Sequence, residues 1–175
     1  MGKTIIYNFL RFFILVILQV AVLKNIGYYS LAVMFPYILI IFLLPIGLSN
    51  LALFLISFSI GLAIDSFYDS IGVHASACVM LAFFRIFFHN ITLEVDEKHS
   101  FNTPSWGIMG FKWFSTYIAL GTLIHHFTLF LIETFSFRNI GQTFISIVLS
   151  TISTIIVIFI ISLLTYKSKS RIISQ

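Results

Sequence analysis

Seven ionisable side chains lie in or beside long apolar runs of this sequence, and they are its strongest candidates for chemistry. They are Asp65, Asp69, His74, Arg85, His126, Glu133 and Arg138. A charged group is costly in an apolar environment, so each of these side chains needs a partner, a cavity or a polar surface. Histidines and carboxylates in such places bind ligands, relay protons, hold metals or join packed helices.

His126 belongs to a polar stripe on one face of a helix predicted over residues 113–135. At about 100° per residue, five positions fall within about 40° of one another. They are Ser115, Ala119, Thr122, His126 and Glu133. The stripe predicts either a ligand pocket or proton path, or a face that packs into a bundle through hydrogen bonds.

His74, Cys78 and Arg85 share a face of a helix predicted over residues 73–89. A His–Cys pair at this spacing could bind a metal, but structural zinc needs about four ligands and no second pair is close in sequence. We therefore expect no metal and no cofactor. The Arg85 guanidinium could either extend to the lipid headgroups or contact another helix.

An intramembrane enzyme would need a nucleophile and a base at one depth, with a route for water. Ser57 and Ser59 are the candidate nucleophiles and His126 is the candidate base, but no spacing supports the pairing. The sequence therefore predicts a protein that is not an enzyme.

The composition places these residues in a membrane. Of 175 residues, 59% are hydrophobic and only 9% are charged, with uncharged runs such as residues 26–63 and 143–166. A soluble domain averages about 25% charged residues, so this chain cannot cover a water-facing surface. The net charge of +4 comes from basic residues at segment ends, which membrane topology explains without nucleic acid. Contact with membrane lipid is expected.

Cutting the chain at its charges, Gly, Pro and Asn predicts an all-α, six-helix transmembrane bundle that forms one domain over residues 1–175. The predicted spans are 5–23, 31–47, 51–67, 73–89, 113–135 and 142–165. The second and third spans are separated by a predicted turn between Pro45 and Asn50, where a proline, a glycine and a possible N-cap follow one another. Without this turn there would be five spans.

Basic residues set the predicted orientation. With six spans and a cytoplasmic N-terminus, eight basic residues lie on the cytoplasmic side and two, Lys24 and Arg138, lie outside. The eight are Lys3, Arg11, Arg85, Lys98, Lys112, Lys167, Lys169 and Arg171. Both termini are therefore expected in the cytoplasm, and the one long connection, residues 90–111, is expected there as well.

Polar and small residues form further stripes on three of the predicted helices, and each stripe is expected to pack against another helix. The stripes are Asn8, Arg11, Leu15 and Gln19 on the first helix, Ser57, Gly61 and Asp65 on the third, and Gln142, Ser146, Ser150, Ser153 and Thr154 on the sixth.

Asp65 and Glu133 each lie near the end of a helix that runs outward, and we expect them to lie together at the outer rim. A carboxylate at a helix C-terminus meets the negative end of the helix dipole, so something must compensate its charge. The candidates are an ion pair with Lys24 or Arg138, or a partner protein that offers a cation.

The segment from Gly61 to Ala77 (GLAIDSFYDSIGVHASA), followed by Leu81–Arg85 (LAFFR), resembles the central motif of the bacterial rod-shape-determining membrane protein family MreD. The later segment from Leu123 to Glu133 (LIHHFTLFLIE) and the first helix from Arg11 to Gln19 also resemble that family. The resemblance covers nearly the whole chain.

The resemblance implies a non-enzymatic scaffold in the bacterial inner membrane. Its partners would be the bitopic protein MreC and, through it, the actin-like MreB filament, the elongation glycosyltransferase and a penicillin-binding protein. The MreD family also looks like the six-helix substrate-binding subunits of energy-coupling-factor vitamin transporters, which gives the alternative function. Such a subunit should offer a polar pocket and an Ala-x-x-x-Ala contact on its first helix, whereas residues 5–23 contain one alanine, Ala21.

Overall fold

Five of the helices are long and apolar enough to cross a membrane, which makes this all-α protein a multi-pass membrane protein. The computed structural model describes residues 2–26, 32–98, 100, 102–134 and 140–166, with the backbone alone for residues 2–5 and 96. The five spanning helices are Ile6–Asn25, Asn50–Tyr68, Val73–Thr92, Phe111–Thr134 and Ile140–Leu164.

The first spanning helix consists of α1 (Gly2–Ile17), a π-helical turn (Leu18–Val22) and a 3-10 turn (Leu23–Asn25). The other four are α3 (Asn50–Tyr68), α4 (Val73–Thr92), α7 (Phe111–Thr134) and α8 (Ile140–Leu164). The sequence predicted all five to within a few residues. Two short helices, α5 (Val95–Lys98) and α6 (Trp106–Met109), lie in the predicted loop.

The prediction of a regular helix over residues 31–47 is wrong. The described part of that range has non-helical backbone up to Phe35, a 3-10 turn (Pro36–Ile38), the four-residue α2 (Leu39–Phe42) and turns beyond it. We call residues 32–48 the central segment. Proline lacks an N–H and clashes inside a helix, so Pro36 can occupy only a first turn and Pro45 limits the other end.

The predicted turn before the third span is confirmed. Ser49 is the N-cap of α3, and its hydroxyl accepts a hydrogen bond from Ala52 N at 3.4 Å. The turn contacts the loop before α6, because Ile46 N and Gly47 N donate to the carbonyls of Asn102 and Ser100.

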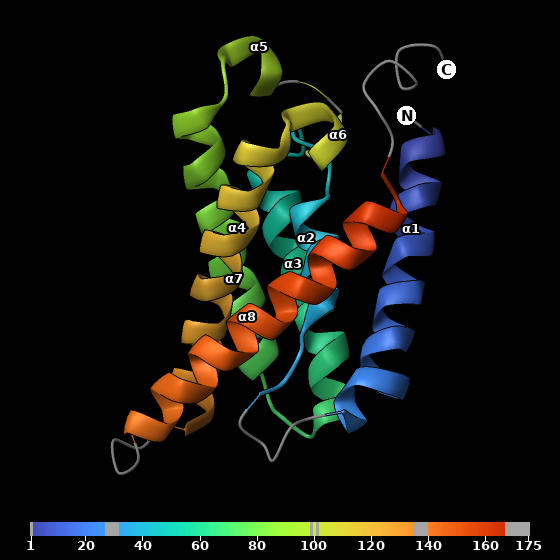
Figure 1. The fold of residues 1–175 in the computed structure, drawn as a ribbon. Helices are drawn as coiled ribbons and strands as arrows, with labels where there is room; N and C mark the ends of the chain where they lie inside the picture. Colours follow the sequence, from blue (N-terminus) through green and yellow to red (C-terminus); the bar gives the residue numbers. More distant parts are fainter. Residues whose placement is uncertain (1, 27–31, 99, 101, 135–139, 167–175) are drawn as a thin grey trace.

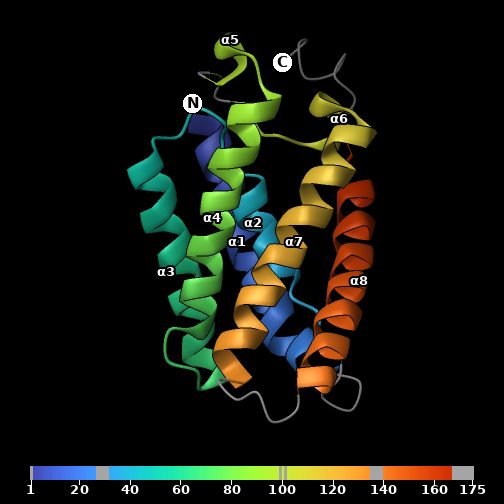
Figure 2. The same ribbon diagram turned by 90° about the vertical axis from the view of Figure 1, so that its left-hand side faces the viewer.

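The spanning helices run between two ends of the bundle, with α1, α3 and α7 in one direction and α4 and α8 in the other (Figures 1 and 2). At one end, which we call the α5 end, α1 begins, α8 ends and α5 and α6 lie. At the other, the Asp69 end, α3 turns into α4. The central segment leads from the Asp69 end back to the α5 end.

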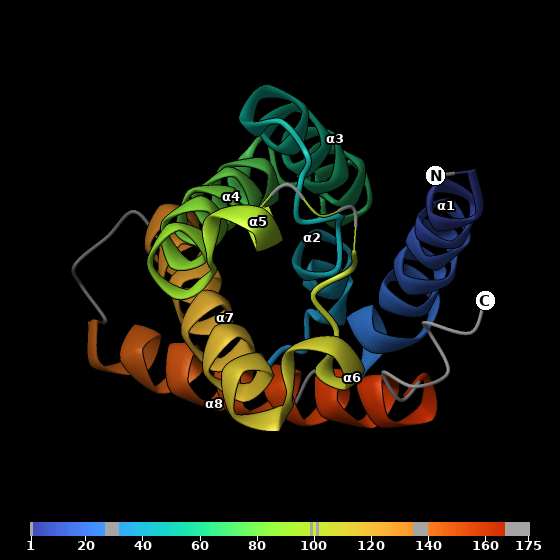
Figure 3. The same ribbon diagram turned by 90° about the horizontal axis from the view of Figure 1, so that it is seen from above.

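Seen from the α5 end, α3, α4, α7 and α8 surround α2 on three sides and α1 stands on the remaining side (Figure 3). Every residue from Phe35 to Leu44 is buried. Helices α3 and α4 pack closely where Gly61 faces the backbone of Ala75: a Cβ on Gly61 would lie 2.4 Å from Ala75 Cα.

Candidate functional site

The central segment receives its missing backbone hydrogen bonds from side chains of the surrounding helices. In an apolar surrounding, backbone outside a regular helix must find such partners. Val33 N donates to Ser150 Oγ at 3.0 Å, Phe35 N donates to Thr154 Oγ1 at 3.0 Å, and Gln19 Nε2 donates to the Met34 carbonyl at 3.0 Å. The polar stripes of the first and last helices therefore hold irregular backbone, a role that the prediction of helix-to-helix packing did not include.

Arg85 performs the same role at the other end of the central segment. Its guanidinium donates to the carbonyls of Ile41 at 2.5 Å, Leu44 at 2.6 Å and Pro45 at 2.8 Å. The side chain is only 2% exposed. Of the two roles left open for Arg85, the structure shows contact within the protein rather than extension to the headgroups.

Tyr37 joins His74 and His125 at the centre of the bundle. The Tyr37 hydroxyl lies 3.0 Å from His74 Nδ1 and 3.0 Å from His125 Nε2, so it can donate to one ring and accept from the other. The Cys78 thiol lies 3.6 Å from the same hydroxyl. His74 and Cys78, which were predicted to share a face of their helix, therefore both contact the Tyr37 hydroxyl. In the described part of the chain, no three His, Cys, Asp or Glu side chains are grouped to hold a metal.

His126 is fully buried in a second set of contacts beside the first. Its Nδ1 lies 2.8 Å from the Thr122 carbonyl, and its Nε2 lies 3.2 Å from Thr154 Oγ1. Thr154 in turn accepts from Phe35 N, so His126 supports the central segment at one remove. Of the two roles that the polar stripe left open, these contacts favour packing at His126.

The Asp65 carboxylate, on α3, binds the free N–H groups at the start of α4, whose N-cap residue is Gly72. Asp65 Oδ1 accepts from Ser70 Oγ at 2.7 Å and from His74 N at 2.9 Å, and its Oδ2 accepts from Ala75 N at 3.0 Å. A carboxylate is stabilised where a helix presents free N–H groups and the positive end of its dipole. Since Asp65 is 3% exposed, the expectation that it forms an outer rim site is wrong, and α4 compensates its charge instead of Lys24.

Replacing Asp65 with asparagine should lower the free energy of unfolding by about 1–3 kcal/mol, because the charge-assisted bonds to α4 are lost and the amide NH₂ meets backbone donors. Denaturant unfolding in detergent micelles measures the change. Asp69→Asn is the matched control: Asp69 is exposed in left-handed conformation (φ 53°), which asparagine also tolerates, so a change within about 0.5 kcal/mol is expected. Equal losses in both variants would contradict the role of Asp65 at the start of α4.

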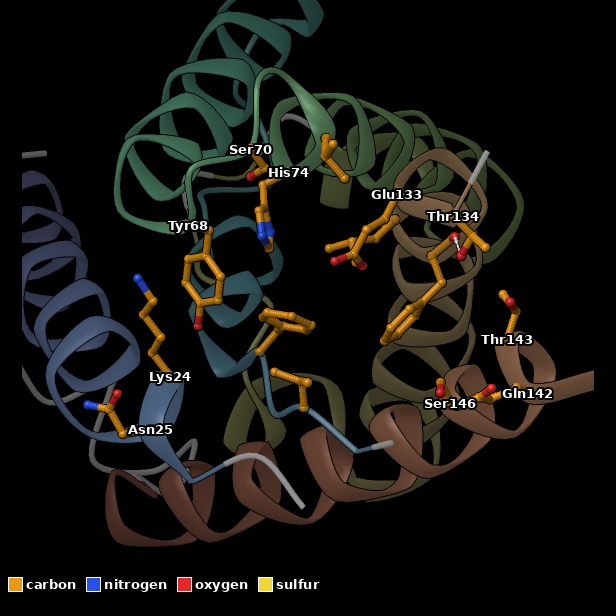
Figure 4. Close-up of a pocket in the computed structure, with 15 residues that line it drawn as sticks. Lys24, Asn25, Tyr68, Ser70, His74, Glu133, Thr134, Gln142, Thr143 and Ser146 are labelled. Atoms are coloured by element: carbon orange, nitrogen blue, oxygen red, sulfur yellow. Dashed lines mark hydrogen bonds between the residues drawn. The ribbon is translucent and has the colours of Figure 1, made fainter. Parts of the chain in front are cut away.

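Glu133 lies instead in a cleft of about 600 Å³ at the Asp69 end. The cleft is lined by the ends of the first spanning helix, α3 and α7, by the starts of α4 and α8, and by the central segment (Figure 4). Lys24 and Glu133 stand on opposite sides of it and His74 points into it. Lys24 Nζ donates to the Phe67 carbonyl and lies 5.2 Å from the centre of the Tyr68 ring.

The structure therefore does not bring the predicted site residues together in one place. His74 and Glu133 share the cleft, whereas Asp65, Arg85 and His126 hold the fold and Asp69 is exposed at the turn; Arg138 lies outside the described residues. Sequence-based prediction did not point to the cleft residues Phe35 and Tyr68. It also did not point to Tyr37 and His125, which share a hydrogen bond at the centre of the bundle. A signal for Tyr37 existed, because it follows Pro36 in an apolar run that a regular helix cannot span.

Comparisons with protein-family models, with curated proteins and with solved structures each found no match to this chain.

Proposed function

We propose that this chain is a non-enzymatic scaffold of the bacterial inner membrane that acts in cell-wall elongation as MreD-like proteins do. It binds an MreC-like bitopic partner, and through that partner it is linked to the MreB filament, the elongation glycosyltransferase and the penicillin-binding protein. Rod shape is maintained when these components stay together.

One observation supports this proposal: three residues in the segments that carry the resemblance connect one element of the fold to another, and we call them the fold joints. Gly61 lets α3 touch α4, Asp65 binds the start of α4, and Arg85 holds the end of the central segment. A motif used in this way maintains a particular shape, as a scaffold requires, and its side chains are already engaged with the protein's own backbone.

Co-purification tests the proposal. The tagged chain, extracted from native membranes in mild detergent, should bring down a bitopic partner with a coiled coil, identified by mass spectrometry. Depletion of the chain should round the cells. Recovery of an ATPase module in place of the bitopic partner would reject the scaffold.

The proposed topology has six crossings, with the central segment as the second and the α5 end in the cytoplasm. Reporter fusions after Gly47 and within residues 94–98 should then report cytoplasm, and a fusion after Asp69 should report the outside, because eight basic residues remain inside in this orientation. An outside signal within residues 94–98 would contradict the orientation, and opposite faces for the two termini would indicate five crossings.

The cleft favours a second candidate function, the substrate-binding subunit of an energy-coupling-factor vitamin transporter. A cavity of about 600 Å³ that carries Lys24, His74 and Glu133 among apolar side chains has the size that small ligands need. Uptake of a vitamin that depends on this chain, together with the ATPase module in the co-purification, would select this function.

A further inference from the structure

The cleft at the Asp69 end combines an unpaired carboxylate with aromatic rings. Glu133 has no hydrogen bond or ion pair within the described part of the chain. The rings of Phe35, Tyr68, His74 and Phe130 line the same cavity. Phe35 and Phe130 are 4% and 8% exposed, whereas Glu133 is exposed, so the cleft places buried aromatic surface beside a carboxylate that a ligand can reach.

Three of these rings touch and form a continuous wall. The Phe35 and His74 centroids are 5.2 Å apart, those of Tyr68 and His74 are 5.0 Å apart, and those of Phe35 and Tyr68 are 6.0 Å apart. An ammonium group is attracted to aromatic faces within about 6 Å, and more strongly where water is excluded. The carboxylate of Glu133 projects toward this wall (Figure 4). This half of the cleft therefore suits an organic ammonium.

The opposite side of the cleft carries the positive charge. Lys24 has three N–H donors and uses one on the Phe67 carbonyl, which leaves donors for an anionic group. Asn25 lies next to it and adds an amide. A ligand with a cation alone would leave Lys24 without a counter-charge, and one with an anion alone would meet Glu133.

We propose that this cleft binds a small zwitterion, with its ammonium group between Glu133 and the aromatic wall and its anionic group toward Lys24. Phosphoethanolamine has this chemistry, either as a free solute or as the headgroup of an ethanolamine phospholipid at the membrane surface. The site is independent of the scaffold role, because none of the three fold joints, Gly61, Asp65 and Arg85, lines it.

Two binding measurements test the proposal and distinguish the sources. The full chain is placed in nanodiscs of phosphatidylglycerol alone, and phosphoethanolamine is titrated by calorimetry. Native mass spectrometry then measures which lipid stays bound when phosphatidylethanolamine and phosphatidylglycerol compete. Saturable binding of the solute indicates a soluble ligand, and selective retention of phosphatidylethanolamine without solute binding indicates the lipid; either result supports the zwitterion site.

Variants locate the binding in the cleft. Glu133→Gln and Lys24→Met should each weaken the observed binding by at least about tenfold, since each removes one charge-assisted contact. Asp69→Asn removes an exposed carboxylate at the same end but outside the cleft, and should leave binding unchanged. Thermal unfolding in the same nanodiscs confirms that each variant is folded.

Three results would overturn the proposal. The first is no binding in either measurement. That result would be expected if the cleft accepts a cation of a partner protein and binds no small zwitterion. The second is unchanged binding by folded Glu133→Gln. The third is ethanolamine binding as tightly as phosphoethanolamine with no effect of Lys24→Met, which would show a cation site only.

Discussion

Replacing Gly61 with alanine should lower the free energy of unfolding by about 3 kcal/mol or more and deplete the protein from the membrane. The added Cβ would lie 2.4 Å from Ala75 Cα, 2.6 Å from Ala75 N and 2.6 Å from the His74 carbonyl oxygen. Overpacking costs about 1–3 kcal/mol where side chains can yield, but these atoms are backbone. The helices cannot separate freely, because Asp65 ties α3 to the start of α4.

Two other glycines provide matched controls for this variant. At Gly121 an added Cβ would lie 2.5 Å from the Phe42 ring, a side chain that can shift, so an intermediate loss is expected. At Gly141, an exposed position in the first turn of α8, a Cβ would meet nothing within 4 Å, so alanine should be neutral or stabilise by up to about 1 kcal/mol. Denaturant unfolding in micelles gives the order, and a Gly61 variant as stable as the Gly141 variant would contradict the close contact.

The sequence predicted the spanning helices well because apolar length is a strong signal in a membrane. The prediction 73–89 compares with Val73–Thr92 for α4, and 142–165 compares with Ile140–Leu164 for α8. The central segment was missed because hydropathy does not distinguish a helix from irregular backbone that is buried. Its partners Ser150 and Thr154 lie 117 and 119 residues away in sequence from the groups that they bind.

Within the site, sequence reasoning identified polar residues better than their partners. The helical period correctly brought Thr122 and His126 together, and the structure joins them through His126 Nδ1 and the Thr122 carbonyl. Asp65 was misplaced because only the dipole of its own helix was considered, whereas the next helix starts beside it and offers its N–H groups. The cleft could not be predicted, because it forms where the ends of separate helices meet.

Replacing Arg85 with leucine should release the α5 end of the central segment. The carbonyls of Ile41, Leu44 and Pro45 would each lose a charge-assisted hydrogen bond. Those of Ile41 and Pro45 would keep long backbone bonds at 3.4 Å. The carbonyl of buried Leu44 would have no partner in the described part of the chain, which is costly. We expect the free energy of unfolding to fall by about 3–5 kcal/mol, a range typical of removing one partner of a buried charged interaction. Hydrogen exchange in nanodiscs should rise first in residues 39–48.

Arg85→Lys separates geometry from charge. A lysine keeps the positive charge, but its compact ammonium group cannot reproduce the fork that contacts Ile41 on one arm and Leu44 and Pro45 on the other. It should therefore recover only part of the lost stability. Arg11→Leu is the control for losing a cation, since the Arg11 guanidinium contacts Asn8 of its own helix at 2.9 Å and its loss should cost about 1 kcal/mol or less.

The pattern of hydrogen exchange in the Arg85→Leu variant shows whether Arg85 holds the central segment or stabilises the whole bundle. If Arg85 holds the central segment, the leucine variant should exchange faster in residues 39–48 while α3 and α7 stay protected, because their own helical hydrogen bonds do not depend on the guanidinium. Uniformly faster exchange across all helices would instead assign Arg85 to the stability of the whole bundle. Unchanged exchange in residues 39–48 would mean that the three carbonyls find other donors, and the segment would then be held by its apolar contacts alone.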